Sequence, residues 1–109
     1  MGQFRRPDIV GLEWDDRNED HVGAHIPPWF IDELIEGNDW FAFPNRRDHP
    51  PEHVLFVGRG PGGRFVTAVL RRPSDENPGF WRPITGWRST DTERRRYQAA
   101  RNRSGGRGD

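Results

Sequence analysis

Short apolar runs separated by turn-forming residues divide the first third of this chain into three elements. Residues 9–14 (IVGLEW) predict a strand, and residues 17–26 predict a helix that two prolines end. Asp15 and Asp16 can both cap this helix, and Asp16 and Glu19 stand at the spacing of a capping box. Residues 28–37 predict a second helix, because apolar side chains recur there at helical spacing and a glycine closes the run.

The rest of the chain predicts strands followed by one helix. The expected strands are residues 39–43, 53–58, 64–71 and 80–87. The expected helix spans residues 91–101 and begins with a capping box formed by Thr90 and Glu93. Consecutive strands joined by short loops favour antiparallel pairing. We therefore expect a small α+β domain, an antiparallel sheet of about four strands with two N-terminal helices and one C-terminal helix.

The length of 109 residues predicts a single domain, and the composition narrows its class. We expect residues 1–8 to be a loose lead-in, residues 9–100 to be the domain and residues 101–109 to be a disordered tail. The absence of cysteine excludes a disulfide framework and a cysteine-based zinc site. No apolar run exceeds about four residues and no signal peptide begins the chain, so we predict a soluble, cytoplasmic protein without a membrane partner.

The formal net charge is zero, but the charges are unevenly distributed along the chain. Residues 1–53 carry 5 arginines and 12 acidic residues, whereas residues 54–109 carry 12 arginines and 5 acidic residues. All 17 basic residues are arginine, whose guanidinium offers a planar fork of donors to phosphate or to an acidic protein. The alternative is that the acidic half folds over the basic half and neutralises it.

Two histidines are candidates for acid–base chemistry. His21 and His25 stand four residues apart on the first expected helix, with Asn18 on the same face. Such a pair supplies a metal site or a proton acceptor, but no glutamate stands at the metalloprotease spacing between them, so we predict no metal site. Histidines that pack against the sheet or face solvent are the alternative.

The second candidate is a cluster of arginines near the end of the chain. Its expected members are Arg82, Arg88, Arg94, Arg95 and Arg96. Few residues separate the last strand from the final helix, so we expect one patch near Glu93 and Tyr97. Such a patch suits an RNA phosphate, and Trp87 suits stacking on an unpaired base. The alternative is a solvated helix face in which Glu93 pairs with an arginine.

Two segments resemble BrnT-type toxins, a family with a RelE-like fold, over about residues 12–97. Residues 14–25 (WDDRNEDHVGAH) resemble the family's opening pattern of Trp-Asp, Asn and two His. Residues 81–87 (WRPITGW) and 90–97 (TDTERRRY) are similar to its closing strand and helix. The resemblance implies the toxin of a type II toxin–antitoxin system, a ribonuclease that a cognate antitoxin protein neutralises in a hetero-oligomer.

The implied reaction is RNA cleavage by attack of a ribose 2′-hydroxyl on the neighbouring phosphate, with no metal or cofactor. It needs a base, an acid and cations that stabilise the charged intermediate. By the resemblance, Arg82 and Arg94 stabilise the phosphate, and Glu93 or His25 accepts the proton. The expected RNA-binding residues are Trp87, Arg88, Arg95 and Tyr97, of which Tyr97 equally suits a core position.

The chain departs from the family pattern at two places. The strand usually ends in Ala-Arg, where this chain has Gly86 and Trp87, and the usual His-Gly-Val is residues 25–27 (HIP). Loss of a group that contacts a charged transition state typically costs about 10²–10³ in rate. The alternative function is therefore a binding module that pairs with an antitoxin-like protein or RNA without cleaving it.

Overall fold

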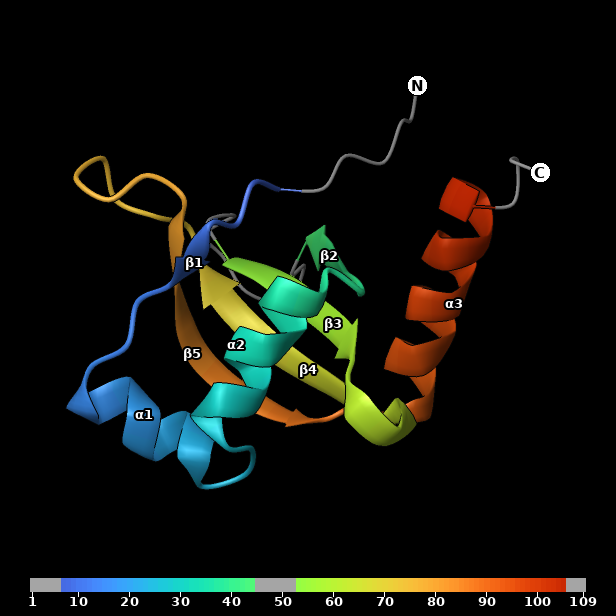
Figure 1. Ribbon diagram of the computed structural model, residues 1–109, viewed down its shortest axis with the longest axis horizontal. Helices are drawn as coiled ribbons and strands as arrows, with labels where there is room; N and C mark the ends of the chain where they lie inside the picture. Colours follow the sequence, from blue (N-terminus) through green and yellow to red (C-terminus); the bar gives the residue numbers. More distant parts are fainter. Residues whose placement is uncertain (1–6, 45–52, 106–109) are drawn as a thin grey trace.

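The computed structural model describes residues 7–44 and 53–105, so parts of the expected lead-in and tail lie outside the described residues. Its elements in chain order are β1 (Gly11–Leu12), α1 (Asp16–Gly23), α2 (Pro28–Gly37), β2 (Trp40–Pro44), β3 (His53–Arg59), the 3-10 turn η1 (Pro61–Gly63), β4 (Phe65–Arg71), β5 (Phe80–Arg88) and α3 (Asp91–Gly105) (Figure 1). The α+β class is confirmed.

The strands form one mixed five-stranded sheet in the order β1-β5-β4-β3-β2, where about four antiparallel strands were expected. β2 to β5 are antiparallel neighbours, as predicted, and β1 pairs parallel with the start of β5. The strand expected over residues 9–14 is wrong in extent, since only Gly11–Leu12 pairs. The chain leaves the sheet after Glu13, because Asp15 must cap α1.

Helices cover both faces of the sheet, with α1 and α2 on one face and α3 over β2 and β3 on the other (Figure 1). Strand alternation explains the two layers, since neighbouring residues point to opposite faces. Ile31 and Leu34 of α2 pack in one core with Phe56 of β3. Tyr97 of α3 packs in the other core with Val57, the next residue of β3.

Asn18 fixes α1 to the sheet. Its side chain is 4% exposed, and its Nδ2 donates to the backbone carbonyls of Glu13 (2.9 Å) and Pro83 (3.0 Å). Asp15 caps α1, as the sequence allowed, but its capping-box partner is Asn18, so the box expected from Asp16 and Glu19 is wrong. The Trp-Asp…Asn pattern therefore has a structural explanation, the docking of a short helix that has few apolar residues of its own.

α3 runs to Gly105, so the helix end expected at residue 101 and the start of the expected tail are wrong. The guanidinium of Arg101 donates to the Tyr97 hydroxyl (3.0 Å) and pairs with Asp39 at the start of β2 (3.5 Å). Ser104 Oγ also donates to the Arg101 carbonyl (3.2 Å). These contacts stabilise the last turns of α3, where few apolar side chains are available to pack on the sheet.

Candidate nucleic-acid interface

Several separate segments meet at one end of the sheet and form a cleft of about 310 Å³. They are the α1–α2 turn, the start of α2, the β3–β4 turn, the end of β5 and the first turn of α3. The polar lining side chains are His25, Arg64, Arg88, Ser89 and Arg94, and the apolar lining includes Pro27, Trp29, Phe30 and Phe65. We call this site the arginine cleft.

Three guanidinium groups make the arginine cleft strongly cationic. Arg64 and Arg88 are exposed, and no described residue forms an ion pair with either. Arg94 pairs with Asp91 three residues earlier, and its side chain remains 50% exposed. No acidic residue is among the described side chains that line the cleft. Guanidinium groups arranged in this way suit the oxygens of a phosphate, which they bind through paired N–H donors.

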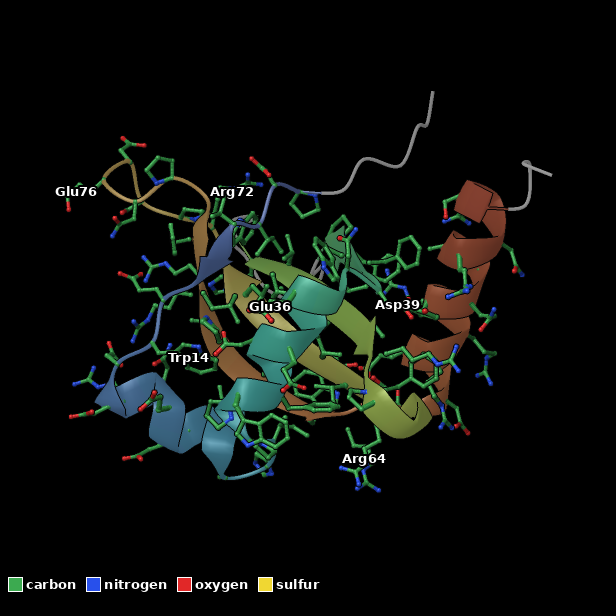
Figure 2. The ribbon with its side chains drawn as sticks, viewed as in Figure 1. Trp14, Glu36, Asp39, Arg64, Arg72 and Glu76 are labelled. Atoms are coloured by element: carbon green, nitrogen blue, oxygen red, sulfur yellow. The ribbon has the colours of Figure 1, made fainter. Side chains whose placement is uncertain are left out.

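The glycine-rich β3–β4 turn places Arg64 in the cleft. Gly62 and Gly63 have φ of +73° and +74°, a left-handed conformation that favours glycine, and they reverse the chain immediately before Arg64. Arg64 extends from this end of the molecule, whereas Arg72 lies near the opposite end of the sheet (Figure 2). The glycine-rich turn therefore presents one arginine to the cleft.

α2 adds to the positive potential of the cleft because the helix begins there. Its N-cap, Pro27, makes no side-chain capping bond, and no acidic residue lies in its first turn. The partial positive charge at the helix N-terminus is therefore not neutralised by a neighbouring carboxylate of that turn.

His25 lies in the arginine cleft, but His21 does not accompany it. α1 ends at Gly23 rather than residue 26, so His25 falls in the turn after the helix and the expected shared helix face is wrong. His21 instead lines a groove of about 720 Å³ between α1 and β5, together with Arg17 and Arg82. No group of three His, Asp or Glu side chains that could hold a metal is found in the described part of the chain.

Arg82 lies apart from the other predicted site residues. It stands near the start of β5 and pairs with Asp15, the N-cap of α1, at 2.8 Å. The Asn18 backbone N–H and then Arg82 hold the pKa of Asp15 below its usual value of 3.8. Arg82 and Arg88 face Arg71 and Val66 of β4, which are five strand residues apart because β5 has a bulge between them. At about 3.3 Å per strand residue, Arg82 lies roughly 17 Å from Arg88. The expectation of a single arginine patch that includes Arg82 is therefore wrong.

Glu93 links α3 to the sheet. Its Oε1 accepts hydrogen bonds from Thr67 Oγ1 (2.9 Å), Trp87 Nε1 (3.0 Å) and the Thr90 backbone N–H (2.8 Å), so the predicted capping box is confirmed. Thr67 has one hydroxyl proton and donates it to Glu93, so Ser89 is the donor in the 2.7 Å Thr67–Ser89 bond. Neither Glu93 nor Trp87 lines the arginine cleft. The sequence predicted the capping role of Glu93, but not its hydrogen bonds to Thr67 and Trp87.

Tyr97 is fully buried, so its ring is not available for stacking on RNA. It contacts Phe41 and Phe65 edge-on, and its hydroxyl donates to Asp39. Burial, followed by the hydrogen bond with Asp39, raises the pKa of this tyrosine above its usual 10.0. Of the two positions that the sequence allowed, the structure gives Tyr97 the core position, while Arg95 is exposed on α3 outside the cleft lining.

Two residues of the arginine cleft were missed by the sequence analysis. Arg64 follows a glycine-rich turn, and its presence directly after two glycines was the available signal. Trp29 lies one position before the apolar stripe of α2, and a large aromatic side chain out of phase with such a stripe is expected on the surface. Trp29 is indeed 59% exposed.

Comparison of the chain with protein-family models, curated proteins and solved structures finds no match. None of the helices within residues 7–44 and 53–105 is long and apolar enough to cross a membrane.

Proposed function

We propose that this domain binds RNA at the arginine cleft. The observation that carries the proposal is the convergence of Arg64, Arg88 and Arg94 from three separate segments on one cleft, with no acidic residue among its described lining. Contacts between arginine and phosphate supply most of the affinity in sequence-independent nucleic-acid binding. The volume of about 310 Å³ is at the lower limit of ligand pockets, which suits one phosphate and its sugar from a longer strand.

Binding can be measured by fluorescence anisotropy with a labelled oligouridylate of about ten nucleotides, a length within the range of known single-strand sites. We expect Arg64→Ala and Arg88→Ala each to weaken binding by about tenfold, the equivalent of one charge-assisted hydrogen bond. Each should also reduce the slope of log affinity against log salt by about 0.7, because one phosphate contact is lost. Both arginines are exposed and form no ion pair within residues 7–44 and 53–105, so the fold should be retained.

Arg103→Ala is the matched control, because it removes one exposed arginine near the other end of α3. It should leave the salt slope close to that of the unchanged protein. Equal losses for Arg103→Ala and the two cleft variants would refute the cleft as the binding site, and no binding by the unchanged protein would refute the function.

RNA cleavage is the second candidate function, because His25 lies in the same cleft as the three arginines. In this reaction the 2′-oxygen forms a bond to phosphorus, the bond from phosphorus to the 5′-oxygen breaks, and a 2′,3′-cyclic phosphate results. His25 accepts the 2′-hydroxyl proton, and the 5′-oxygen takes a proton from the resulting imidazolium or from water. The arginines stabilise the negative charge on the phosphate.

His25→Ala tests the cleavage step separately from binding. With a chelator present, it should abolish cyclic-phosphate products and change the affinity for the oligouridylate little. Products that persist at the same rate would exclude His25 as the proton acceptor.

The toxin–antitoxin role and the RelE-like fold remain proposals from the sequence resemblance. They predict that induced expression in a bacterial host arrests growth and degrades RNA, and that Arg88→Ala relieves both effects. Normal growth with abundant folded protein would favour the binding module over the ribonuclease. Copurification of a small protein encoded beside this chain would support an antitoxin partner.

A further inference from the structure

Trp29 is the feature of the arginine cleft that phosphate binding leaves unexplained. It is the second residue of α2 and is 59% exposed, while the next residue, Phe30, is 5% exposed. The cleft that Trp29 lines also holds the guanidinium groups of Arg64, Arg88 and Arg94. Ligand sites are typically lined by aromatic and apolar side chains together with a few convergent polar groups, and the arginine cleft has this composition.

The indole ring of Trp29 packs against a buried neighbour, Phe30. It meets the Phe30 ring edge-on, with centroids 5.8 Å apart and an interplanar angle of 89°. Phe30 is itself held against the β3–β4 turn, since a Cβ at Gly60 would lie only 2.6 Å from Phe30 Cζ. Pro27 and Pro28 fix the backbone before the helix. A ligand that stacks on Trp29 therefore meets a side chain whose backbone is already ordered.

We infer that Trp29 is a stacking surface for an unpaired RNA base, so that the arginine cleft selects single-stranded RNA over duplex RNA. The inference rests on the proposed function and names its substrate class. The phosphate lies against Arg64, Arg88 and Arg94, and the adjoining base lies on the indole ring. In a duplex the bases are paired and stacked on one another, and their faces cannot reach a side chain at the backbone.

Three labelled probes of equal length separate the base contact from the backbone contact. They are an oligouridylate, the same ribose-phosphate backbone without bases, and a duplex RNA. Stacking on an aromatic side chain contributes about 5- to 150-fold per base in affinity. Because Trp29 remains more than half exposed, we expect the lower part of that range.

Trp29→Ala should weaken binding of the oligouridylate by about 5- to 10-fold and leave binding of the abasic backbone unchanged. Trp29→Phe keeps a smaller aromatic face, so its affinity for the oligouridylate should lie between that of the unchanged protein and that of Trp29→Ala. Trp29→Leu keeps an apolar side chain without an aromatic face and serves if the alanine variant loses its fold. Glu33→Ala, another exposed position on α2, is the matched control.

Each outcome decides between the two proposals. Equal weakening of both single-stranded probes by Trp29→Ala, or no weakening of either, overturns the base contact while leaving backbone binding by Arg64 intact. A preference of the unchanged protein for duplex RNA also overturns it. If the unchanged protein binds none of the probes, the proposed function fails, and the base contact fails with it.

Discussion

Replacement of Glu93 distinguishes a structural carboxylate from a catalytic one. Glu93→Ala removes the acceptor of three donors, the Thr67 hydroxyl, the Trp87 indole N–H and the Thr90 backbone N–H. Loss of a capping bond costs about 1 kcal/mol, and each of the two other donors left without a partner costs about 1 kcal/mol at the low end of the measured range. The low end applies because Thr67 can turn its proton toward Ser89.

The expected loss is therefore about 3 kcal/mol of the free energy of unfolding. In a urea titration followed by circular dichroism, with a slope of roughly 1.5 kcal/mol per M, the midpoint should fall by about 2 M. Glu93→Gln keeps an oxygen where all three donors converge, and loses only the charge. We expect it to cost about 1 kcal/mol, the difference between charged and neutral acceptors.

Glu36→Ala removes an exposed carboxylate from α2 and serves as the control, with an expected effect close to zero. A midpoint for Glu93→Ala equal to that of Glu36→Ala would refute the structural role. If Glu93 has the catalytic role predicted from the sequence, Glu93→Gln should instead affect cleavage rather than stability. If the domain cleaves RNA and Glu93→Gln abolishes cleavage with an unchanged urea midpoint, Glu93 is the proton acceptor.

Three further outcomes follow from the hydrogen bonds and ion pairs of the structure. Asp91→Asn should tighten oligouridylate binding about two- to fivefold by anisotropy, since it releases Arg94 and removes a negative charge beside the cleft, and weaker binding would contradict this. The chain has one tyrosine, so phenolate absorbance reports Tyr97 alone and should titrate above pH 10.0. The raised pKa of Tyr97 stabilises the fold fully below pH 10.0, and this contribution is lost as the pH rises through the folded pKa. Titration at or below pH 10.0 would show an exposed ring. The lowered pKa of Asp15 stabilises the fold above about pH 3.8 and that contribution is lost as the pH falls through the folded value, so Asp15→Asn should flatten the acid side of a stability–pH curve, whereas an unchanged curve would mean that the cap and Arg82 do not favour the charged form.

Local patterns predicted the elements well where the signals were strong. The helix over Pro28–Gly37 is confirmed at both bounds, because a proline, an apolar stripe and a terminal glycine agree. The final helix begins at Asp91 as expected, since Thr90 and Glu93 form the predicted capping box. These features depend on residues within one or two turns of each other, which is the range that sequence periodicity covers.

Long-range placement was beyond the sequence pattern. The parallel pairing of β1 depends on bonds from Val10 and Glu13 to the chain near β5, across about seventy residues, and no periodicity encodes it. The expected patch is wrong at Arg82 because only the end of β5 lies near the final helix, whereas Arg82 lies near the start of that strand. Arg64 was missed for the converse reason, since a residue distant in sequence is close in space.

The distribution of ion pairs explains how a chain of zero net charge retains a cationic site. Neutralisation by the acidic half accounts for part of the uneven charge, because Arg82 and Arg101 of the basic half pair with Asp15 and Asp39 of the acidic half. These pairs join α1 to β5 and α3 to β2, so neutralisation coincides with the docking of helices. The arginine cleft lies where α2 begins and the β3–β4 turn ends, and no described acidic side chain lines it. A local excess of positive charge therefore persists there, and binding at the cleft should depend on salt as steeply as in a more basic protein with the same number of phosphate contacts.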